Sequence, residues 1–86
     1  MMVEEQIVGK WKWYTVSYDF RSDGTYDYFN SDSGVRTSGR YAILSDGEIT
    51  FFVNGPVRSR FSLQGNKLTL IPEGGTAANA ATFSRQ

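Results

Sequence analysis

The sequence predicts an all-β fold: an up-and-down meander of eight antiparallel strands that closes into a small barrel. Turn signals rich in Gly, Asn, Asp and Ser recur at short intervals along the 86 residues and leave short runs between them. Those runs are rich in Tyr, Phe, Val, Ile and Thr, and the chain has 6 Phe, 5 Tyr and 2 Trp but only 2 Pro. At 9.7 kDa there is material for one core, so we predict a single domain over residues 1–86.

The turn signals place the elements in order. Ser22–Gly24 and Ser45–Gly47 repeat a Ser-Asp-Gly loop, which suits a hairpin with glycine in a left-handed position. Residues 3–8 are predicted to form one helical turn, and Ala77–Ala81 is a second short helical candidate. The strands are predicted over residues 9–14, 16–21, 25–30, 35–44, 48–53, 57–63, 67–71 and 81–85.

Register strengthens the prediction, because side chains alternate faces along a strand and a one-residue slip would expose the whole core set. Four hairpins, considered independently, put the bulky residues on one face. The predicted pairs are Phe20 with Tyr26, Tyr18 with Tyr28, Ile43 with Ile49, Tyr41 with Phe51, Val53 with Val57, Ile49 with Phe61, Leu63 with Leu68 and Phe61 with Leu70. The opposite face receives Asp19, Arg21, Asp27, Arg40, Glu48, Thr50, Arg58, Arg60 and Thr69.

Eight such strands can form a sandwich or a closed barrel. Sequential hairpins favour the barrel, because closure also removes unpaired strand edges. In this register Gly39 faces inward opposite Tyr26, where the missing side chain leaves room for the ring or permits a bulge.

The composition excludes most catalytic and charge-driven functions. With no Cys and no His, the chain has no thiolate nucleophile, imidazole base, Cys/His zinc site or disulfide. Nine basic and nine acidic side chains cancel, so we expect no attraction to nucleic acid or to a membrane. We therefore predict a protein that is not an enzyme, with no catalytic residues, no metal and no cofactor.

The N-terminal residues bear on localisation. Met1–Gln6 is short and acidic, and no apolar stretch of signal-peptide length follows it. The sequence as it stands predicts a cytoplasmic location, unless a leader or further domains belong to a longer parent protein.

Three residues carry a resemblance to a known superfamily. Gly9-Lys10-Trp11, after a short helical turn, resembles the Gly-X-Trp motif that opens the first strand of lipocalins and other calycins, and Arg85 resembles the arginine that lies across that tryptophan from the last strand. The chain is similar in style to small bacterial lipocalin-like domains of unknown function. The resemblance implies that one barrel end is closed by the N-terminal turn against Trp11 and that the other end is a mouth for a small apolar or amphipathic ligand.

The register places specific residues at that mouth. An aromatic cleft with a few convergent hydroxyls is typical of small-molecule sites. The inward residues nearest the mouth are predicted to be Trp13, Tyr18, Tyr28, Thr37, Val53, Val57, Ser59 and Leu70, of which Trp13, Tyr18, Tyr28, Thr37, Val53 and Ser59 are the candidate ligand-binding residues.

An alternative function stays open, because an eight-stranded barrel can be filled by its own side chains. The chain would then be a solid-core scaffold or protein-protein interaction module acting as a homo-oligomer. Four apolar residues on the outer face would make the contact if they are contiguous: Phe29, Leu44, Phe52 and Ile71.

The charged outer face has two notable features. Asp19 and Asp27 are predicted to lie directly opposite each other, which destabilises a strand pair, and we expect Lys10 or Lys12 to compensate. A calcium site and a pair of catalytic carboxylates are weaker interpretations of the two aspartates, because neither a ligand ladder nor a substrate cleft accompanies them. The second feature is a basic strip of Arg36, Arg40, Arg58 and Arg60 with Phe52 and Glu48, for which cross-strand ion pairs are favoured over a single-strand nucleic-acid platform.

Overall fold

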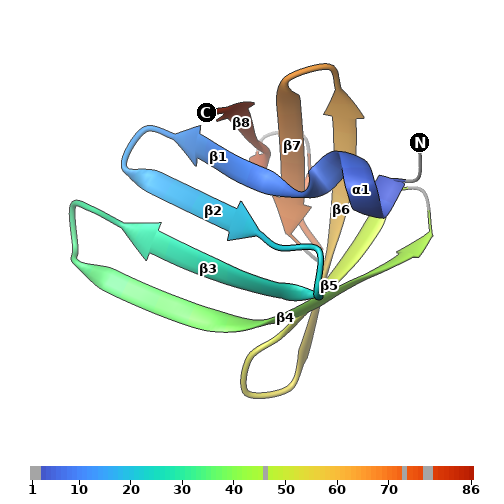
Figure 1. Ribbon diagram of the computed structural model, residues 1–86, viewed down its shortest axis with the longest axis horizontal. Helices are drawn as coiled ribbons and strands as arrows, with labels where there is room; N and C mark the ends of the chain where they lie inside the picture. Colours follow the sequence, from blue (N-terminus) through green and yellow to red (C-terminus); the bar gives the residue numbers. More distant parts are fainter. Residues whose placement is uncertain (1–2, 46, 73, 77–78) are drawn as a thin grey trace.

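The computed structural model describes residues 3–45, 47–72, 74–76 and 79–86. A short helix, α1 (Val3–Ile7), precedes eight strands that close into a barrel in chain order, with β8 returning to pair with β1 (Figure 1). Every ladder is antiparallel, so the predicted all-β barrel is confirmed. The strands are β1 (Gly9–Trp13), β2 (Val16–Phe20), β3 (Thr25–Asn30), β4 (Val35–Ser45), β5 (Glu48–Phe52), β6 (Pro56–Gln64), β7 (Lys67–Pro72) and β8 (Ala81–Arg85).

The predicted elements match the observed ones closely. The N-terminal helical turn is confirmed as α1. Of the other helical candidate, Ala81 begins β8, while residues 77 and 78 lie outside the described residues. Predicted pairs confirmed by the ladders are Phe20 with Tyr26, Tyr18 with Tyr28, Ile43 with Ile49, Tyr41 with Phe51, Leu63 with Leu68 and Phe61 with Leu70.

The predicted register of the β5–β6 hairpin is wrong by two residues. Ile49 pairs with Ser59 instead of Phe61, and Phe51 instead of Val53 pairs with Val57. Two consecutive residues, Asn54 (φ 57°) and Gly55 (φ 106°), take left-handed backbone conformations and reverse the chain one residue earlier than expected. A slip of two residues keeps every side chain on its predicted face, so the inside and outside of β6 are unaffected.

The core lies on the predicted inward face. Its most deeply buried side chains, each less than 2% exposed, are Ile7, Trp11, Phe20, Ile49 and Leu68. The prediction that outer-face residues meet water is wrong for Thr50, which is 4% exposed and whose hydroxyl has no hydrogen-bond partner among the described residues. Thr50 is the middle residue of β5, between Ala42 of β4 and Arg58 of β6, so its short side chain gains little access to solvent.

The facing carboxylates of Asp19 and Asp27 are confirmed, but the expected compensation by lysine is wrong. Arg21 Nη1 lies 2.7 Å from Asp27 Oδ2 and 3.9 Å from Asp19 Oδ2. Arg21 follows Asp19 by two residues and so projects from the same side of the chain, where it reaches the facing strand diagonally. The hydrogen bond from Arg21, together with one from Ser38, lowers the pKa of Asp27 to about 2.

Candidate functional site

One end of the barrel is closed by side chains from both ends of the chain. Trp11 Nε1 donates a hydrogen bond of 2.8 Å to the carbonyl oxygen of Ile7 in α1, and both residues have no exposed surface. The guanidinium carbon of Arg85 lies 4.2 Å from the centre of a Trp11 ring. Arg85 also donates hydrogen bonds to the carbonyl oxygens of Val8, at 2.9 Å, and of Gln6. The arginine therefore ties β8 to the segment that leads into β1.

The opposite end of the barrel is open. In Figure 1 the β1–β2 and β3–β4 hairpins project to the left and the β5–β6 hairpin projects downward, while α1 lies on the other side. A cavity of about 330 Å³ lies at this mouth. Four aromatic residues line the cavity together with five other apolar residues and one serine: Tyr18, Tyr26, Phe51 and Phe83, then Val53, Val57, Leu70, Pro72 and Ala81, and Ser59.

The structure brings three of the six candidate ligand-binding residues into this cavity. Tyr18, Val53 and Ser59 line it. Trp13 is 37% exposed and lies beside the cavity, with 6.0 Å between its ring centre and that of the lining residue Phe83. Tyr28 packs edge-on against Tyr18, with 5.4 Å between the ring centres. Thr37 on β4 pairs with Tyr28. Tyr28 and Thr37 are not among the described residues that line the cavity.

Sequence reasoning missed the contribution of the last strand. Ala81 and Phe83 line the cavity, and Phe83 is 2% exposed. The signal was present in the sequence, because Ala81, Phe83 and Arg85 alternate along one strand and so share the inward face already expected for Arg85. Tyr26, whose ring contacts those of Phe20 and Phe51, also lines the cavity and is not among the residues that the register predicts at the mouth.

No Lys, Arg, Asp or Glu is among the described residues that line the cavity. Burial, reinforced by the neighbouring Tyr26 and Tyr28, raises the pKa of Tyr18 far above its usual value. Burial also raises the pKa of Tyr26. Both phenols therefore stay protonated and able to donate hydrogen bonds at neutral pH.

A search against protein families finds one that covers nearly the whole chain. The lipocalin-like domain matches residues 7–84. This chain belongs to the lipocalin-like domain family. Members of that family commonly bind small hydrophobic ligands and are generally not enzymes. No curated protein matches the chain.

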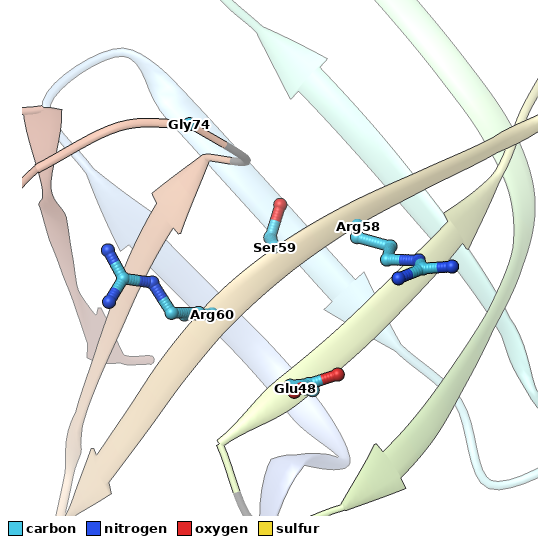
Figure 2. Close-up of a pocket in the computed structure, with 5 residues that line it drawn as sticks. All are labelled: Glu48, Arg58, Ser59, Arg60 and Gly74. Atoms are coloured by element: carbon cyan, nitrogen blue, oxygen red, sulfur yellow. The ribbon is translucent and has the colours of Figure 1, made fainter.

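The lipocalin-like barrel has a second pocket, of about 200 Å³, on the outer side of β6 (Figure 2). Figure 2 shows the guanidinium groups of Arg58 and Arg60 extending in opposite directions from this strand, with Glu48 on the neighbouring strand. The ion pairs expected with Glu48 do not form among the described residues. Arg60 donates instead to the carbonyl oxygen of Gly75 at 3.1 Å, and Arg36 lies over the Phe29 ring at 4.2 Å.

The described residues contain neither a metal-binding cluster nor a membrane-spanning helix. No cluster of three or more His, Cys, Asp or Glu side chains is arranged to hold a metal ion. No helix among them is long and apolar enough to cross a bilayer.

Proposed function

We propose that this lipocalin-like barrel is a non-catalytic binding protein that takes one small apolar or amphipathic molecule into the mouth cavity. The observation that carries the proposal is an aromatic-walled cavity of about 330 Å³ that opens at one end of the barrel. That volume lies within the range of roughly 300–1,000 Å³ typical of small-molecule sites.

The packing of the two ends supports this function over a solid-core scaffold. A scaffold needs no internal space, and an unfilled apolar cavity costs stability in proportion to its volume. Here the closed end is packed around Trp11, whereas Val57 at the mouth is 51% exposed. A bound apolar molecule would cover this lining and recover part of the lost contact energy.

The test uses a neutral, environment-sensitive dye, Nile red, titrated into the protein while its emission is recorded. Ser59→Phe places a ring in the cavity and should lower the affinity for the dye at least about tenfold, because the ring occupies the ligand's volume. The matched control is Ser62→Phe, the same change on the exposed face of the same strand, which should bind the dye like the wild type. Equal binding by both variants would contradict the mouth as the site.

Native mass spectrometry of freshly purified protein provides an independent check, because it reports co-purified small molecules and subunit number together. A single bound small molecule on a monomer supports the binding function. A ligand-free oligomer supports the scaffold alternative, in which exposed outer residues such as Leu44 and Phe52 make the contact.

A further inference from the structure

We propose that the mouth cavity selects an uncharged aromatic ligand that carries a hydrogen-bond acceptor, such as an aryl ketone or a quinone. This inference rests on the proposed function and specifies the chemical class of the molecule that it binds.

The first observation is a pair of cavity-lining phenols without partners. The hydroxyls of Tyr18 and Tyr26 make no hydrogen bond with the described residues, and neither hydroxyl oxygen is fully buried, so both can meet a molecule that enters the cavity. Tyr41, outside the cavity, shows the usual arrangement for a phenol near the core: its hydroxyl donates to the carbonyl oxygen of Arg21 at 2.8 Å. The two lining phenols thus have donor capacity that an acceptor on a ligand can satisfy.

The second observation is that no charged residue is among the described residues that line the cavity, so none of them compensates an ionic charge. The nearby cationic groups of Arg58 and Arg60 project from the outer face of β6, whereas Ser59 between them lines the cavity. A carboxylate moved into the cavity would lose water without gaining a counter-charge, which is unfavourable. A carbonyl oxygen has no such penalty and still accepts from a phenol.

The third observation is the arrangement of the rings. Tyr18 stacks on Phe51 with 5.7 Å between the ring centres and meets Phe83 edge-on at 5.3 Å. Tyr26 meets Phe51 edge-on at 5.0 Å. These residues offer both ring faces and ring edges around the cavity, and a further aromatic ring can pack in either geometry.

The experiment compares three ligands of one shape by isothermal titration calorimetry at pH 7. The ligands are 2-acetylnaphthalene, which has an acceptor and no charge, 2-ethylnaphthalene, which has neither, and 2-naphthoate, which has an acceptor and a negative charge. We expect 2-acetylnaphthalene to bind about fivefold more tightly than 2-ethylnaphthalene, the effect of one net hydrogen bond. We expect 2-naphthoate to bind at least about tenfold more weakly than 2-acetylnaphthalene.

Two variants identify the donor. Tyr18→Phe and Tyr26→Phe each keep the ring but remove the hydroxyl, so at least one should reduce the preference for the acetyl over the ethyl compound to near unity. The matched control is Tyr14→Phe, because Tyr14 is 79% exposed and does not line the cavity.

The outcomes separate the two proposals. Equal binding of the acetyl and ethyl compounds, tighter binding of the naphthoate, or an acetyl preference that survives in both variants overturns the selectivity and leaves the binding function standing. If neither the three naphthalenes nor Nile red binds, the proposed function fails, and the selectivity fails with it.

Discussion

At the end of the barrel that α1 covers, Ile7, Trp11 and Leu68 have no exposed surface, whereas at the mouth Trp13 and Val57 expose 37% and 51% of theirs. Trp11 and Trp13 are two residues apart on β1 and so share one face of it, which means that inward placement alone does not decide burial. What differs is the cover. The closed end has a helix and an arginine laid across it, whereas the β1–β2, β3–β4 and β5–β6 hairpins project at the mouth.

Backbone hydrogen bonds show the same asymmetry. At the closed end, three turns each accept a backbone hydrogen bond of 2.9 Å from a strand outside their own hairpin. The donor amides and acceptor carbonyls are Tyr41 to Gly24, Phe61 to Gly47 and Arg85 to Asn66. At the mouth, Ser31 donates to Thr15 at 2.9 Å. The β5–β6 turn, as far as the structure describes it, has only its internal bond between Val53 and Gly55. Among the described residues, the turns of the closed end are therefore bonded to more of the neighbouring strands than the turns of the mouth are.

The largest expected effect is at the closed end. Trp11→Ala should lower the free energy of unfolding by about 3–5 kcal/mol, because it removes a fully buried indole and its hydrogen bond to Ile7. Urea denaturation followed by far-ultraviolet circular dichroism measures the change. Val57→Ala at the mouth is the counterpart and should lose less than about 1 kcal/mol. Similar losses for the two variants would remove the asymmetry between the ends.

Gly39 lies against the cavity-lining residue Val53, so a substitution there should affect both stability and binding. A Cβ added at Gly39 would lie 2.7 Å from Val53 Cγ2 and 2.8 Å from the carbonyl oxygen of Phe52. Gly39→Ala should therefore lower the free energy of unfolding by about 1–3 kcal/mol, and it should also weaken Nile red binding because Val53 lines the cavity. Denaturation and dye titration of the same preparation measure both effects. A destabilised variant with unchanged dye affinity would show that Val53 does not shape the site.

The arginine across Trp11 should have a smaller effect. Arg85→Met keeps an extended apolar side chain but removes the cation-π contact and the hydrogen bonds to Val8 and Gln6, so we expect a loss of about 1–2 kcal/mol. Arg58→Met, an exposed arginine on β6, is the control and should change stability by no more than about 0.5 kcal/mol. If the two variants lost the same amount, Arg85 would not secure the closed end.

The smallest effect concerns the outer face, which belongs to neither end. The pKa of Asp27 is lowered to about 2 by Arg21 and Ser38, so its carboxylate stabilises the fold above its unfolded pKa of roughly 3.9. That contribution is lost as the pH falls from about 4 towards 2. Thermal unfolding across this range should show a steeper fall of Tm in the wild type than in Asp27→Asn, and parallel curves would argue against the Arg21 contact in solution.

Much of the fold is predictable because hairpin loops and side-chain alternation constrain each other. The Ser-Asp-Gly pattern, with left-handed glycines at Gly24 and Gly47, predicts the correct register of the β2–β3 and β4–β5 hairpins. The predicted register of the β5–β6 hairpin is wrong because a loop that starts at Val53 and one that starts at Asn54 put the same side chains on the inward face. The left-handed backbone of two consecutive residues, Asn54 and Gly55, selects the loop that starts at Val53. The alternation of side chains alone does not distinguish this loop from the one that starts at Asn54.

The site was predictable only where it depends on strand alternation. Tyr18, Val53 and Ser59 follow from the register, but the depth to which each side chain reaches depends on how the hairpins splay. The inward face of Tyr28 predicts a place at the mouth; its ring packs edge-on against Tyr18, and Tyr28 is not among the described residues that line the cavity. The role of Arg21 beside Asp19 and Asp27 was missed for a similar reason, because its reach across strands depends on rotamers and not on sequence spacing.

The most direct measurement of the asymmetry is a backbone-amide NMR titration with 2-acetylnaphthalene. An open mouth and a closed opposite end predict saturable shifts of Val53, Ser59 and Phe83, with Ile7 and Leu68 unchanged. Shifts centred on α1 and Trp11, or no saturable shift anywhere, would contradict the account.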